Sequence, residues 1–106
     1  MAKSAMVTGS VSTSSVRAVI RRNIKQVKAC YQRQLKSNPQ LNGKVVVKIV
    51  IASDGTVKKV EVTRSTVKDK TFEKALLAVI KRWRFPKPAG GGTLVVSYPF
   101  IFRTAG

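Results

Sequence analysis

The sequence contains no histidine, a single cysteine and only four acidic residues. Histidine is the usual general base near neutral pH and the commonest metal ligand, so its absence removes the ordinary routes to both functions. The lone thiol, Cys30, can form neither an internal disulfide nor a cysteine-based metal site. With carboxylates this few and this scattered, the sequence predicts a protein that is not an enzyme and has no metal or cofactor.

Long hydrophobic runs are also missing. No stretch reaches the roughly 18 apolar residues that a membrane span requires. The first fifteen residues lack the apolar centre of a signal peptide. We therefore expect either a cytosolic protein or a fragment whose targeting element lies upstream. At 106 residues, 43% of them hydrophobic, the chain is long enough for one domain with a real core.

Basic residues dominate the composition: 21 Lys and Arg face 4 Asp and Glu, which gives a net charge of +17. Such a balance predicts an anionic partner, which could be nucleic acid, an acidic membrane surface or an acidic polymer. The alternative is a basic surface that is simply solvated.

The first half of the sequence predicts a flexible segment and one helix. We expect residues 1–11 to be flexible and residues 12–106 to form the domain. Apolar residues at helical spacing predict a helix from about Ser12 to Lys36, which ends before Asn38-Pro39. Cys30 lies beside this apolar stripe, where a half-buried and unreactive thiol is expected. A basic face adjoins the stripe and consists of Arg17, Arg21, Arg22, Lys25 and Lys28.

The second half alternates between strand and helix signals. Residues 45–51 and 56–64 flank a Ser53-Asp54-Gly55 turn and predict a hairpin, in which the phase of Val57 indicates a bulge. Asp69 is placed to cap a second helix that runs to about Trp83. Residues 94–102 predict a last strand, and Gly90 to Gly92 a mobile corner before it.

This α-β-β-α-β order predicts an α+β fold. The hairpin and the helical crossover give a three-stranded antiparallel sheet of order 2-1-3, with both helices on one face. Pro99 independently indicates that the last strand lies at an edge, because proline has no N–H to donate to a sheet ladder and does not suit a central strand.

An uncharged edge strand is open to pairing with another chain. We therefore expect a partner strand to add to the last strand, along Leu94, Val95, Val96, Ser97, Tyr98, Pro99, Phe100, Ile101 and Phe102. The alternative is that the N-terminal segment covers this edge, or that Pro99 leaves it unused.

Nucleic-acid binding is the second hypothesis, and it would use the basic face of the first helix. Against it, the aromatic residues needed for base stacking are all expected in the core. Phosphate binding by Gly90 to Gly92 is disfavoured, because this loop precedes a strand and lacks the Lys-Ser/Thr pair.

The chain also resembles a known family. Motifs similar to the C-terminal domain of TonB-type energy transducers are Gly43-Lys44-Val45-Val46-Val47, Asp54-Gly55-Thr56-Val57, Ser65-Thr66 and Trp83-Arg84-Phe85-Pro86. A closer resemblance, to the myxobacterial gliding-motility proteins of the AgmX (GltJ/GltG) type, lies in Cys30-Tyr31, Asn38-Pro39, Gly91-Gly92 and Tyr98-Pro99-Phe100-Ile101-Phe102. Together these motifs span about residues 12–102.

The resemblance implies a periplasmic domain of a longer protein that is anchored in the inner membrane. In such proteins an ion-driven motor, here expected to be proton-driven, acts on outer-membrane or periplasmic partners. The family binds a short partner peptide by adding it to the last strand. Many gliding-type relatives carry a second cysteine early in the second helix, but this chain has Phe72 to Leu76 there, so Cys30 stays unpaired. An acidic partner, peptidoglycan or anionic lipid could account for the excess charge.

Overall fold

The computed structural model describes residues 6–8, 13–88 and 92–103. The elements in chain order are β1 (Met6–Thr8), α1 (Thr13–Arg22), α2 (Ile24–Leu35), β2 (Gly43–Ile51), β3 (Val57–Ser65), α3 (Lys70–Lys81) and β4 (Leu94–Phe102). Three residues of the predicted flexible segment thus form a strand. The predicted mobile corner falls largely on residues 89–91, outside the described residues.

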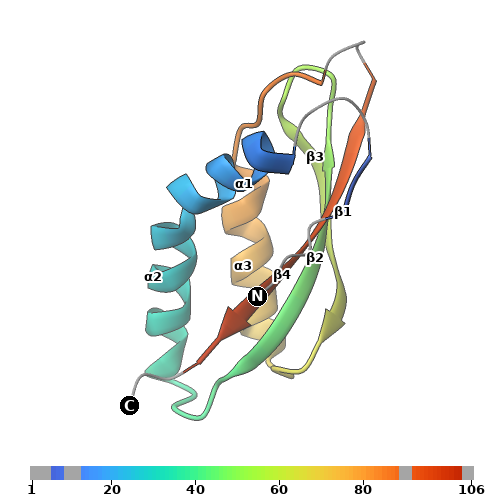
Figure 1. Cartoon of the computed structure of the whole chain (residues 1–106). Coiled ribbons are helices and arrows are strands. Elements are labelled where there is room, and N and C mark those ends of the chain that lie inside the picture. The colour runs from blue at the N-terminus through green and yellow to red at the C-terminus, as the bar shows by residue number, and fades with distance from the viewer. Residues whose placement is uncertain (1–5, 9–12, 89–91, 104–106) are drawn as a thin grey trace.

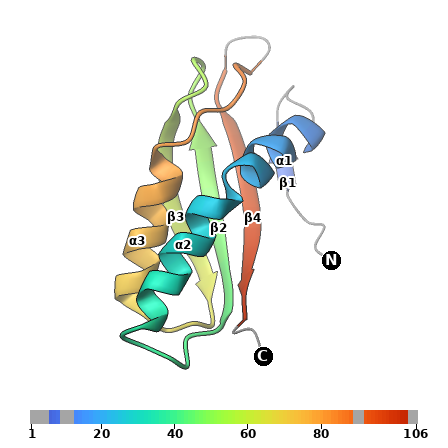
Figure 2. The same ribbon diagram turned by 90° about the vertical axis from the view of Figure 1, so that its left-hand side faces the viewer.

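One antiparallel sheet has the strand order β1-β4-β2-β3, and the helices cover one of its faces (Figure 1). The predicted α+β class and the order of the three long strands are confirmed. The short strand β1 lies beside β4, and its residues were expected to be part of a flexible segment. No helix of the described residues lies on the other face of the sheet (Figures 1 and 2).

The predicted first helix is divided in two at Asn23. This residue has φ −104° and ψ 8°, outside helical geometry, and its side-chain Nδ2 donates to the carbonyl of Val19 at 2.9 Å. The same carbonyl also accepts the Asn23 N–H at 3.1 Å, so the side chain adds a second bond to the last turn of α1, where the helix ends. As a result α1 lies over the β4 side of the sheet, whereas α2 turns and runs beside α3 (Figure 2).

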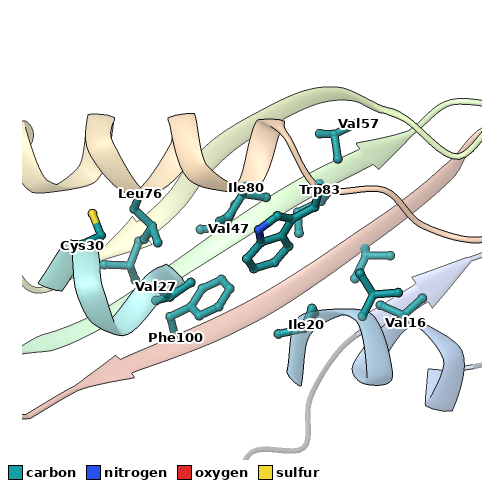
Figure 3. Packing of buried hydrophobic residues seen from close by; sticks show 14 of the residues in the cluster. Val16, Ile20, Val27, Cys30, Val47, Val57, Leu76, Ile80, Trp83 and Phe100 are labelled. Atoms are coloured by element: carbon teal, nitrogen blue, oxygen red, sulfur yellow. The ribbon is translucent and has the colours of Figure 1, made fainter. Parts of the chain in front are cut away.

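The core lies between the helices and the sheet. Phe72 of α3 is fully buried and packs its ring edge-on against Phe102, with centroids 4.8 Å apart. Trp83 and Phe100 point into the same layer (Figure 3), and the Trp83 indole N–H donates to Gln26 Oε1 at 3.0 Å. Cys30 is 3% exposed, so its thiol is more deeply buried than the half-buried position that was expected.

The hairpin between β2 and β3 is anchored to the segment that follows α3. The predicted bulge is confirmed, because the register shifts between Val50 and Ile51 and sets Val57 opposite Ile51. Gly55 has φ +91°, and its carbonyl accepts a hydrogen bond from the Phe85 N–H at 2.8 Å. The α3–β4 connection is therefore held at the hairpin turn before β4 begins.

Candidate partner-strand edge

The two edges of β4 have different neighbours. Its inner edge pairs with β2 along its whole length, from Gly43 opposite Phe102 to Ile51 opposite Leu94. Its outer edge pairs with β1 only at Val95, Val96 and Ser97. In the described part of the chain, the outer edge from Tyr98 to Phe102 has no neighbouring strand. The N-terminal segment thus covers part of the edge that was expected to bind a partner strand, which was one of the two alternatives to partner binding.

The hydrogen bonds of β2 show which backbone groups of β4 face outward. The Lys44 N–H donates to Thr66 Oγ1 at 2.9 Å, and the Lys44 carbonyl accepts from the Thr66 N–H at 2.9 Å. The Val46 carbonyl accepts from Thr63 Oγ1 at 3.3 Å. Both β2 residues therefore direct their backbone toward the β3 side.

The β4 residues opposite Lys44 and Val46 must consequently direct their backbone away from β2. These residues are Ile101 and Pro99. Alternate residues of an antiparallel strand bond to opposite sides, so Tyr98, Phe100 and Phe102 bond toward β2. Since proline has no N–H, the open edge offers the Ile101 N–H together with the carbonyls of Pro99 and Ile101.

The side chains of β4 alternate between the two faces of the sheet. Phe100 and Phe102 are 3% and 5% exposed beneath the helices, and Tyr98 on the same face is half-buried. Ile101 lies on the face without helices and is 54% exposed. The aromatic side of the strand therefore faces the core, as the alternation predicted.

A groove of about 610 Å³ separates α2 from the open edge of β4. Its lining is mostly apolar, with Lys28 and Arg103 as its charged members. The lining residues are Ile24, Val27, Lys28, Tyr31, Gln32, Leu35 and the segment from Tyr98 to Arg103. Tyr98 to Phe102 in the strand wall belong to the strand that was predicted to pair with a partner. The helix wall was not predicted, because the apolar stripe of α2 does not indicate which strand the helix approaches.

The predicted basic face is distributed over two helices. Arg17, Arg21 and Arg22 lie on α1, Lys25 and Lys28 lie on α2, and all five side chains are exposed. Of the seven aromatic residues, six are buried and Tyr98 is half-buried. The basic face therefore has no exposed aromatic ring on which a base could stack.

Residues 31–104 match the family model described as Gram-negative bacterial TonB protein C-terminal. The chain belongs to this family. No curated protein matches the chain. The solution NMR structure of the Pseudomonas aeruginosa TonB C-terminal domain is similar in fold, with a TM-score of 0.53 and 23% identity. That match covers 70% of this chain and 76% of the Pseudomonas chain.

TonB C-terminal domains are non-catalytic protein-interaction domains, and they are periplasmic in Gram-negative bacteria. The family match begins at Tyr31, inside α2, and includes β2, β3, α3 and β4. It leaves out β1, α1 and the first half of α2. None of the helices within the described residues has the length and apolar character needed to cross a membrane.

Proposed function

We propose that this TonB C-terminal domain is the periplasmic end of an inner-membrane-anchored protein of the gliding-motility AgmX type. In this role it links a proton-driven motor to outer-membrane or periplasmic partners, without catalysis. The partner adds a strand to the outer edge of β4. The edge from Tyr98 to Phe102, which no strand of the described residues covers, carries the proposal together with the outward N–H of Ile101.

Strand addition suits this edge because main-chain hydrogen bonds supply affinity whereas alternate side chains supply selectivity. An antiparallel partner can exchange both hydrogen bonds with Ile101 and can donate to the carbonyl of Pro99. At Val95, Val96 and Ser97 the outer edge is already paired with β1. A partner therefore pairs with Tyr98 to Phe102, or extends toward Leu94 only after β1 has left.

Two residues of the motifs shared with the AgmX type, Tyr31 and Asn38, hold one corner of the domain. The Tyr31 hydroxyl donates to the carbonyl of Leu41 at 2.5 Å, across the turn between α2 and β2. Asn38 Nδ2 donates to Asp69 Oδ2 at 3.0 Å, which ties this turn to the start of α3. The motifs Cys30-Tyr31 and Asn38-Pro39 thus have a structural basis.

The net charge of +17 favours an anionic surface in the envelope. An acidic partner protein, peptidoglycan or anionic lipid head groups would each present such an anionic surface. Long-range attraction would raise the rate of encounter, while pairing at β4 would select the partner.

Strand addition can be tested with peptides selected from a displayed random library against the 106-residue chain. We expect a selected peptide to protect the Ile101 amide from hydrogen exchange and to give backbone contacts to β4 in NMR spectra. Ile101→Pro should abolish binding, because it removes the outward N–H and leaves the bonds to β2 in place. Ile101→Ala retains the N–H and is the matched control.

Loss of binding in both Ile101 variants would indicate that the side chain, and not the backbone, makes the contact. Selected peptides that bind without changing the exchange of the Ile101 amide would contradict strand addition. Circular dichroism of each variant excludes unfolding as the cause.

A further inference from the structure

We infer that one end of the sheet face that no described helix covers binds an anionic bilayer surface, through lipid phosphates and an inserted isoleucine. The site, called the sheet-end patch below, has three apolar and three basic members: Val46, Pro99, Ile101, Lys44, Arg64 and Arg103. It lies at the end of the sheet opposite the β2–β3 hairpin, where β2 begins and β4 ends. The contact uses side chains on a face of the sheet and does not depend on strand addition at the edge of β4.

The alternation of β2 separates its side chains into two sets. The odd-numbered residues from Val45 to Ile51 are fully buried beneath the helices. Lys44 and Val46 therefore lie on the opposite face of the sheet. Side chains of paired residues in adjacent strands share a face, so the partners of Lys44 and Val46 lie on this face too.

The partners bring apolar and basic side chains together. Lys44 is opposite Ile101 of β4. Val46 lies between Pro99 of β4 and Arg64 of β3. Because the backbone of Lys44 bonds toward β3, Lys44 and Ile101 form a non-hydrogen-bonded pair, whose Cα atoms are typically about 4.5 Å apart. The cationic chain of Lys44 therefore leaves the sheet directly beside Ile101.

A hollow of about 520 Å³ opens beside this pair. Lys44 and Arg103 are the charged residues that line it, and both are exposed. Neither forms an ion pair with another described residue, since the ion pairs of the described residues go to Glu61. Asn42 and Thr66 add neutral polar groups, and none of the described lining residues is acidic. The hollow therefore favours an anion, such as the phosphate of a lipid head group.

Ile101 distinguishes the sheet-end patch from the other basic surfaces. It is 54% exposed, more than any other large apolar residue that the structure describes. Among the described residues, the basic face of α1 and α2 has no apolar side chain of this size and exposure. Binding to a bilayer surface grows with buried apolar area as well as with attraction to anionic lipid. A hydrated anionic polymer would match the cations but would gain nothing from Ile101.

The distribution of charge on this face also suits a bilayer. In the middle of the face, Lys48 and Lys59 share the carboxylate of Glu61, at 3.8 and 3.9 Å. This carboxylate would repel a rigid acidic partner that covered the whole face. Lipid head groups move laterally, so they can collect at the three cations of the patch without a fixed spacing. Each cation near an anionic membrane raises the affinity about fivefold.

Flotation of the whole chain with lipid vesicles tests the inference. One set of vesicles contains phosphatidylcholine alone, and the other contains phosphatidylcholine and phosphatidylglycerol in a ratio of about three to one. At about 0.15 M salt we expect binding to the anionic vesicles only. Ile101→Ser should weaken this binding about fivefold, because it removes the apolar contact and keeps the N–H that strand addition requires. Unchanged binding of this variant would overturn the inference and leave strand addition in place.

Two variants that each lose one positive charge separate the sheet-end patch from the net charge. Lys44→Gln removes a cation of the patch and should weaken binding to the anionic vesicles about fivefold. Lys25→Gln removes an exposed cation of α2, on the helix side of the sheet, and should change binding little. Equal effects of the two variants would show that the net charge alone drives binding and would refute the site.

NMR spectra identify the face and its occupant. In anionic bicelles that contain a paramagnetic lipid, we expect the signals of Val46 and Ile101 to broaden and that of Arg21 to stay sharp. The reverse pattern would assign the bilayer to the helices and contradict the inference. Soluble polyglutamate and inorganic phosphate are the remaining probes. If either shifts the signals of Lys44 while the vesicles do not bind, the occupant is an acidic protein or a simple anion, and the bilayer is excluded.

Discussion

Asp69 connects three parts of the domain through one carboxylate. Its Oδ1 accepts the Phe72 N–H at 3.0 Å and caps α3, while its Oδ2 accepts from Asn38 and Gln34 at 3.0 and 3.2 Å. These bonds favour the ionised form, with the bond from Asn38 first and that from Phe72 second, and they lower the pKa of Asp69 below its usual value.

The carboxylate of Asp69 should contribute measurably to the free energy of unfolding. Asp69→Ala should lower the free energy of unfolding by about 1 kcal/mol at pH 7, which is typical of a lost N-cap. Because the folded pKa is depressed, the ionised form stabilises the protein above the unfolded pKa of about 3.9, and this stabilisation is lost as the pH falls through the folded pKa. Urea unfolding at pH 7 and pH 3 measures both effects.

Asp69→Asn is the matched control for the charge. Its oxygen can still cap α3, but its amide group presents hydrogens to Asn38 and Gln34, much as a protonated carboxyl does. The stability difference between the wild type and this variant should therefore shrink as the pH falls below about 4. A difference that stays constant from pH 7 to pH 3 would show that ionisation of Asp69 contributes nothing.

Cys30 gives a second prediction at the residue scale. Burial raises the pKa of its thiol, although the nearby Arg33 partly opposes this, so less thiolate is present at a given pH. We expect a disulfide reagent to react slowly with the native protein at pH 8 and rapidly in urea. Cys30 is the single thiol of the chain, so the signal is unambiguous. Equal rates in both conditions would contradict an inaccessible thiol.

At the scale of elements, the hairpin turn determines where β4 begins. Gly55 has φ +91°, and a Cβ added there would lie 2.2 Å from the backbone oxygen of Phe85. Gly55→Ala should therefore destabilise the domain by on the order of 2–3 kcal/mol, from backbone strain and from the displaced connection. Thermal unfolding followed by circular dichroism provides the measurement.

Gly92→Ala is the control for this turn. A Cβ at Gly92 would meet no atom within 4 Å, and its φ lies outside the left-handed region. Its stability should match the wild type within about 0.5 kcal/mol, as at most surface sites. If the two glycine variants lost equal stability, the close approach of Gly55 to Phe85 would not be the reason.

The strands were predictable because their signals are local. The alternation in β2, the turn at Asp54-Gly55 and the proline in β4 together predicted the order of the three long strands. The helix break was not predictable in the same way, since the apolar spacing continues from Ile20 to Ile24 across Asn23. β1 has only three residues, which is too short for a recognisable alternation of apolar and polar side chains. Its formation depends on pairing with β4, which is distant in the sequence.

The candidate edge was predicted more fully than the candidate groove. Pro99 and the strand order were sufficient to place β4 outermost of the three long strands, and they depend on backbone chemistry alone. The groove depends on the direction of α2 after Asn23, and thus on packing between distant segments. The covering of Val95 to Ser97 by β1 likewise requires the tertiary structure.

At the scale of the whole molecule, repulsion between like charges opposes folding. The ion pairs of the described residues join Lys48 and Lys59 to the same Glu61, at 3.8 and 3.9 Å, and all three side chains are substantially exposed. The domain measures 45 × 24 × 22 Å, so at 0.01 M salt the Debye length of about 30 Å exceeds its two short dimensions.

Added salt should therefore stabilise the protein. We expect Tm to rise as sodium chloride increases from about 0.01 to 0.15 M, where the Debye length falls to about 8 Å. Differential scanning calorimetry at pH 7 measures the shift, and potassium chloride at equal ionic strength should reproduce it. A fall in Tm over this range would indicate that the charges attract one another on balance.

Pro99 has a consequence for solubility. An apolar edge strand with all of its outward amides could template further copies and grow into a fibre. Here one outward donor is missing at Pro99, and the neighbouring stretch is already occupied by β1. Another copy that pairs with this edge therefore gains few backbone hydrogen bonds. The same proline that limits a partner strand acts as a gatekeeper against endless stacking, so the domain can keep an edge open and remain dispersed.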